Sequence, residues 1–98
     1  MSEVKSAYEE LSSEHKLYAD MLRLMEGLLA NEDKQDPFKS MSLYFFENYA
    51  DIKTTLNRAK EAHQVVQSEF LTYFVTEWGI MLDIFEKTAS KLLVELPQ

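Results

Sequence analysis

The stretch from Phe70 to Phe85, FLTYFVTEWGIMLDIF, would be apolar on nearly every side if it formed a helix. A helix with one apolar stripe can lie on a core, whereas a helix that is apolar all round must be covered on several sides. The chain has only 98 residues in which to build that cover. We therefore expect part of the cover to come from another chain.

The composition predicts a single folded helical domain over residues 1–98. Hydrophobic residues make up 46% of the chain and charged residues 28%, which is typical of a globular protein rather than a disordered one. Only two glycines and two prolines interrupt it, and this scarcity favours long helices. The absence of cysteine excludes disulfides, zinc–thiolate sites and thiol nucleophiles. The amino terminus lacks the apolar core of a secretory signal, and we expect a cytoplasmic protein.

The net charge of −7 indicates what kind of partner the protein can have. Residues 1–36 carry nine acids and four bases, residues 37–68 three acids and four bases, and residues 69–98 five acids and two bases. The corresponding net charges are −5, +1 and −3. An acidic protein is repelled by nucleic-acid phosphates and anionic lipid, so we expect neither direct nucleic-acid binding nor membrane binding.

The first helix is expected over about residues 3–30. An apolar row with alternating spacings of four and three runs along it, which is the pattern of a coiled coil: Val4, Tyr8, Leu11, His15, Tyr18, Leu22, Met25 and Leu29. A second row joins it in the later half, formed by Leu17, Met21, Leu24 and Leu28. Gly27 either weakens the last turn or allows close packing of another helix.

A linker is expected over residues 31–40, with Asp36 and Pro37 forming a good helix start. Helical sequence follows over 38–78 and 80–95, and its apolar row begins with Phe45, Tyr49, Ile52, Leu56 and Ala59. Two architectures fit this pattern. A turn near residues 64–68 would make an antiparallel bundle of three long helices, whereas a bend at Gly79 would make a hairpin with one long helix. Either is expected to be completed by dimerisation.

No motif of an enzyme is present, and we predict neither catalysis nor a cofactor. His15 and His63 lie on the apolar rows, but neither has the preceding glutamate of a bundle metal site, so no metal is expected. The sequence after His63 also lacks the lysine and small residue of a histidine phosphotransfer domain. Phosphotransfer or metal binding is therefore the weakest of the functional alternatives.

Aromatic residues are the stronger signal, because ten of the twelve lie from Phe38 onward. Aromatic side chains bury a large area and are favoured at protein interfaces. We therefore predict a homodimer whose contacts come from the second half of the chain: Phe46, Phe70, Leu71, Phe74, Val75, Trp78, Met81, Leu82 and Phe85.

The leading functional prediction is a small acidic module that binds another protein, as inhibitors, immunity proteins, secretion chaperones and adaptors do. The candidate contact residues for a basic partner lie on the first helix and the linker: Asp20, Met21, Met25, Glu26, Glu32, Asp33 and Asp36. The alternative is a structural subunit of a larger helical assembly that docks through residues 70–85.

Overall fold

The computed structural model describes the backbone of residues 2–97 and the side chains of residues 15–97. Within this part the chain forms four helices and no strand: α1 (Ser2–Ala30), α2 (Pro37–Glu47), α3 (Tyr49–Val65) and α4 (Glu69–Lys91). The predicted all-α fold is confirmed. There are four helices where three long ones or a hairpin were expected.

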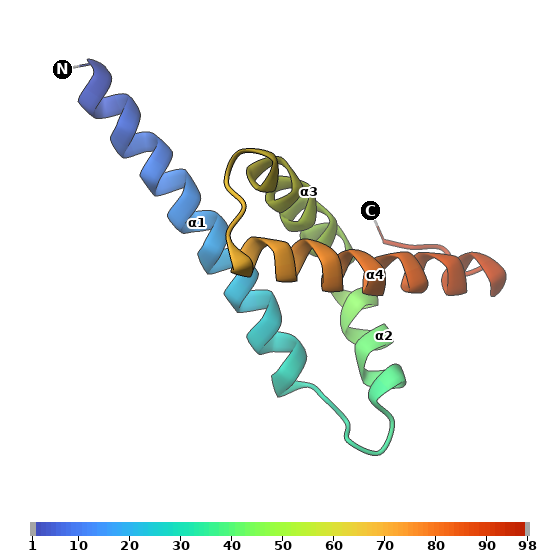
Figure 1. The fold of residues 1–98 in the computed structure, drawn as a ribbon. Helices are drawn as coiled ribbons and strands as arrows, with labels where there is room; N and C mark the ends of the chain where they lie inside the picture. Colours follow the sequence, from blue (N-terminus) through green and yellow to red (C-terminus); the bar gives the residue numbers. More distant parts are fainter. Residues whose placement is uncertain (1, 98) are drawn as a thin grey trace.

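The helices pack unevenly. α3 and α4 pack most extensively against one another, α1 packs on α3, and α2 lies against both α3 and α4. The amino-terminal half of α1 extends beyond the other helices (Figure 1). The radius of gyration is therefore 15.6 Å, whereas a compact chain of this length would have about 13 Å.

Two of the helices begin at side-chain caps. Asp36 accepts a hydrogen bond from the Lys39 backbone N–H at 3.1 Å, and Pro37 occupies the first position of α2. Ser68 caps α4 in the same way, accepting from the Leu71 N–H at 3.1 Å. Of the two alternatives that the sequence left open, the structure has the turn near 64–68, and Gly79 lies inside α4 without interrupting it.

The helical sequence over 38–78 is also divided at Asn48, where the prediction was wrong. Asn48 ends α2 and precedes α3, and both its backbone N–H and its side-chain amide donate to the Tyr44 carbonyl, at 3.0 and 2.9 Å. The bond from the backbone N–H is the ordinary helical one, whereas the bond from the side-chain amide is an additional local bond of the kind that competes with helical structure at asparagine. The last helix ends at Lys91, and residues 92–97 turn back instead of continuing it to residue 95.

The core contains side chains from all four helices. The predicted row Phe45, Tyr49, Ile52, Leu56 and Ala59 is entirely buried. Trp78 lies between Phe45 and Phe74, with ring centroids 5.3 and 5.1 Å away. Tyr49 of α3 also lies 5.9 Å from Phe85 of α4, so aromatic contacts join α2, α3 and α4.

On α1 the core uses the second apolar row. Leu17, Met21 and Leu24 are buried, whereas Leu22 and Leu29 of the first row are 47% and 69% exposed. The two rows are offset by one residue, which is a rotation of about 100° around a helix. The coiled-coil row therefore lies to one side of the core, which only its Tyr18 and Met25 contact among the described residues, while Leu22 and Leu29 face outward.

Candidate functional site

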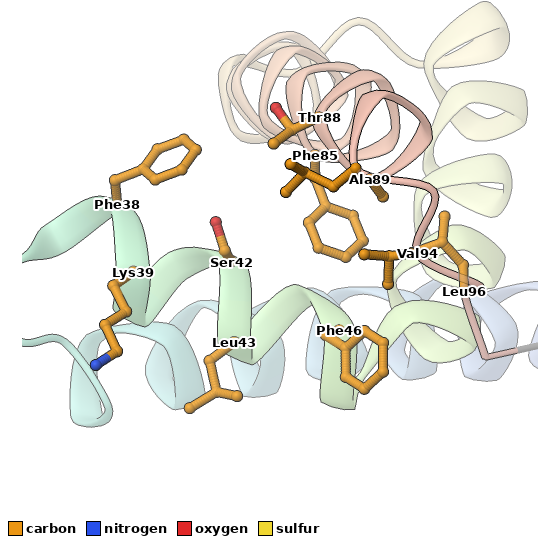
Figure 2. A pocket seen from close by; sticks show the side chains of 11 residues that line it. Phe38, Lys39, Ser42, Leu43, Phe46, Phe85, Thr88, Ala89, Val94 and Leu96 are labelled. Atoms are coloured by element: carbon orange, nitrogen blue, oxygen red, sulfur yellow. The ribbon is translucent and has the colours of Figure 1, made fainter.

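An apolar groove lies between α2 and the end of α4. It encloses about 440 Å³, which is within the range of small binding sites. Figure 2 shows Phe85, Thr88 and Ala89 of α4 gathered opposite α2, with Val94 and Leu96 beside them. The polar side chains in its lining belong to Lys39, Ser42 and Thr88; the apolar ones are Phe38, Leu43, Phe46, Phe85, Ala89, Leu92, Val94 and Leu96.

The side of the groove on α2 follows from helical spacing. Lys39, Ser42, Leu43 and Phe46 are separated by three, one and three residues, so they share one face of the helix. The opposite face of the same helix buries Tyr44 and Phe45 in the core. A short helix that is apolar on both faces can pack on the bundle and still offer an apolar surface.

A tight turn after α4 supplies the other side of the groove. The Val94 N–H donates to the Ala89 carbonyl at 3.0 Å and the Leu93 N–H donates to the Ser90 carbonyl at 3.2 Å, which is the Schellman arrangement. Leu93 takes the left-handed conformation that this turn needs, with φ of 57°. The turn brings Val94 and Leu96 back over the groove.

A polar hollow adjoins the groove and shares Lys39 and Leu43 with it. Asp33 and Glu47 supply two carboxylates to this hollow, and Asn31 also lines it. A ligand lying along α2 would therefore meet apolar side chains on one side and, on the other, two carboxylates and the cation of Lys39.

Close packing against α1 fixes the position of α2. The buried Tyr44 hydroxyl donates to the Leu24 carbonyl at 3.0 Å. A Cβ at position 27 would overlap that hydroxyl, so Gly27 allows the close approach, as one of the two sequence interpretations predicted. Burial raises the pKa of the Tyr44 phenol; Arg23 opposes this shift and Asp51 adds to it.

A second tyrosine joins α3 to α4. The Tyr49 hydroxyl donates to Glu86 Oε2 at 2.8 Å, and Lys53 Nζ lies 5.3 Å from the centre of the ring. Burial, followed by the bond to Glu86, raises the pKa of Tyr49. The hydroxyl thus keeps its proton, and with it the hydrogen bond, above the ordinary pKa of tyrosine.

The predicted partner-binding residues are spread over different environments. Asp20 bonds to Arg58 at 2.9 Å and lies 3.6 Å from Arg23, so it helps join α1 to α3. Met21 is fully buried and Met25 is half-buried against the core. The remaining members are exposed, although Asp33 and Asp36 also hold the turn before α2 through their carboxylates: Glu26, Glu32, Asp33 and Asp36.

Most of the predicted self-association residues lie inside the chain itself. Leu71, Phe74, Trp78, Leu82 and Phe85 are buried, and the half-buried members are Phe70, Val75 and Met81. Phe46 is exposed, and together with Phe85 it lines the groove. The exposed apolar residues of the 70–85 stretch are on the outer side of α4: Tyr73, Ile80 and Ile84.

The histidines lie in different surroundings. His15 is exposed, whereas His63 is half-buried and shares a hydrogen bond with the Thr72 hydroxyl at 2.9 Å. In the described part of the chain, no group of three or more histidine and carboxylate side chains is placed to hold a metal ion.

Sequence reasoning missed Phe38, Leu43, Leu92 and Val94 of the groove. The sequence of α2 contained an indication of the groove. Its core residues are Tyr44 and Phe45, and Phe38, Leu43 and Phe46 are further apolar residues that the core does not bury. The contribution of Leu92 and Val94 depends on the reversal after Lys91, for which the sequence offers no glycine.

Among the described helices, none combines the length and apolar character needed to cross a membrane. The chain matches no protein-family model, no curated protein and no solved structure with which it was compared.

Proposed function

We propose that this protein is a protein-interaction module that binds an amphipathic, basic helical segment of a partner protein in the groove between α2 and the end of α4. The observation that carries the proposal is the groove itself, whose exposed apolar walls include Phe38, Leu43 and Phe46. Apolar grooves of this kind accept the apolar face of a helix, with anchors at every third or fourth position.

The charge distribution supports a basic partner. Asp33 and Glu47 line the hollow beside the groove, and the whole chain carries a net charge of −7. A helix with leucines on one face and lysines on the other would place its apolar face in the groove and cations near these carboxylates. Such charge complementarity mainly accelerates association and makes it sensitive to salt.

A labelled synthetic peptide tests the proposal by fluorescence anisotropy. The peptide carries leucines at helical spacings of three and four and lysines elsewhere; a second peptide replaces each lysine with glutamate. We expect the lysine peptide to bind, with affinity that falls as salt rises, and the glutamate peptide to bind at least about tenfold more weakly. Equal binding of the two peptides, or no binding, would contradict the proposal.

Variants locate the binding surface. Leu43→Glu places a charge on the exposed wall of the groove and should weaken peptide binding at least about tenfold. Ile80→Glu is the matched control, because Ile80 is similarly exposed but lies on the outer side of α4. Similar losses in both variants would mean that the peptide does not bind in the groove.

A further inference from the structure

The first apolar row of α1 is only partly covered by its own bundle, where Tyr18 packs against Phe70 of α4 with ring centroids 5.5 Å apart and Met25 packs at the edge of the core. The row repeats with coiled-coil spacing from Val4 to Leu29, through four heptads. In its described part, His15, Leu22 and Leu29 are exposed, while Tyr18 and Met25 are half-buried at the edge of the core. A regular row of this length normally pairs with a helix of the same period.

We propose that α1 pairs with α1 of a second copy of this chain to form an antiparallel two-stranded coiled coil. The shape of the molecule favours this occupant. The amino-terminal half of α1 extends beyond the bundle, and the carboxyl half carries the exposed row beside the bundle (Figure 1). In an antiparallel pair, the extended half of each copy covers the exposed row of the other.

The sequence supports one register for this pair. With Leu22 of one copy opposite Leu11 of the other, Leu29 meets Val4, Met25 meets Tyr8 and His15 meets Tyr18. Each layer then joins one residue from each of the two core positions of the heptad, as antiparallel pairing requires. No layer places two charged side chains together.

The flanking charges favour the antiparallel orientation over the parallel one. In this register Lys5 of each copy lies beside Glu26 of the other, which gives two opposite-charge pairs by symmetry. In a parallel pair of the same row, Glu14 would flank Ala19 and Glu26 would flank Met21, so neither glutamate would have a cation. Flanking charges of this kind set helix orientation.

Light scattering after size-exclusion chromatography tests whether the pair forms. We expect a mass of about 23 kDa, twice the 11.5 kDa of one chain. Leu22→Glu and, separately, Leu29→Glu should each raise the dimer dissociation constant at least about a hundredfold, because each buries two carboxylates per dimer. Circular dichroism confirms that each variant is helical, and Ile80→Glu should remain dimeric.

Two results of this measurement would overturn the proposal. One is a monomer at every concentration up to about 1 mM, where even a weak association of about 4 kcal/mol would be visible. The other is a dimer that both α1 variants leave intact. Neither result depends on peptide binding by Leu43 and its neighbours, so the groove proposal and this one fail separately.

Disulfide cross-linking tests the orientation without interference, because the chain has no cysteine. In the proposed register, position 22 lies opposite position 11 and about 16 Å along the axis from position 22 of the other copy. Disulfide formation needs Cα atoms within about 7 Å. A mixture of Leu11→Cys and Leu22→Cys proteins should therefore cross-link, and each alone should not. Cross-linking of each variant with itself would establish a parallel pair and overturn the proposal.

Discussion

α4 and α1 use their apolar residues in opposite ways. α4 is the more apolar helix, yet three of its large aromatic side chains, Phe74, Trp78 and Phe85, are buried within the same chain. α1 carries two apolar rows, of which the bundle buries one and leaves Leu22 and Leu29 of the other exposed. The number of apolar residues in a helix thus indicates how much surface must be buried. Whether the same chain buries that surface depends on where each apolar row lies relative to the core.

The comparison changes which part of the chain is left uncovered by its own helices. The expectation from the sequence was that the stretch from Phe70 to Phe85 exceeds what a single chain can enclose. The structure buries Leu71, Phe74, Trp78, Leu82 and Phe85 of this stretch and leaves Tyr73, Ile80 and Ile84 exposed. The more regular uncovered surfaces lie on α1 and at the groove beside α2.

The largest expected effect tests the enclosure of α4. Trp78 is 2% exposed and lies between two aromatic rings, so Trp78→Ala should reduce the free energy of unfolding by about 3–5 kcal/mol. Urea denaturation followed by circular dichroism measures the change. Tyr73→Ala is the control on the exposed side of α4, and we expect its effect to be within about 0.5 kcal/mol. If Trp78→Ala reduced the free energy of unfolding by less than about 1 kcal/mol, the burial of α4 within its own chain would be contradicted.

The next prediction concerns the packing of α1 within its own bundle. In most helices glycine to alanine stabilises by roughly 0.5–1 kcal/mol. Here a methyl group at position 27 overlaps the Tyr44 hydroxyl, so we expect Gly27→Ala to destabilise by about 1–3 kcal/mol. The sign of the change, measured by urea denaturation, distinguishes close packing from ordinary helix propensity.

A second substitution isolates the cause of that effect. Tyr44→Phe removes the overlapping oxygen, although it also removes the hydrogen bond to the Leu24 carbonyl. We therefore expect Gly27→Ala to cost less in a Tyr44→Phe background than in the natural sequence, because residues in contact are energetically coupled. Equal costs in the two backgrounds would show that the loss does not come from this contact.

The sequence predicted the helices better than it predicted their roles. The start of α2 at Asp36 and Pro37 followed from capping chemistry, and the buried row from Phe45 to Ala59 followed from its spacing. The sequence did not indicate which of the two α1 rows would enter the core, because both rows have helical spacing and only the packing of α1 on α3 decides between them.

The candidate groove was less predictable than the core. Phe46 and Phe85 were singled out for an interface, but the sequence did not indicate that α2 separates from α3 at Asn48. The distinctive feature of that break is the hydrogen bond from the Asn48 side-chain amide to the Tyr44 carbonyl, which the residue type alone does not reveal. The return of Val94 depends on a left-handed residue, and the residue that adopts this conformation is a leucine.

Leu93 therefore provides the smallest expected effect and the sharpest test of how the groove is closed. A left-handed conformation costs a residue with a Cβ about 1–2 kcal/mol, and Leu93 is 91% exposed, so its side chain does little to offset that cost. Leu93→Gly should then stabilise the protein by about 1 kcal/mol in urea denaturation. Leu92→Gly is the matched control, because Leu92 has φ of −88° and gains nothing from glycine. If both substitutions destabilised equally, the turn that brings Val94 over α2 would not form as described, and the groove would lose that wall.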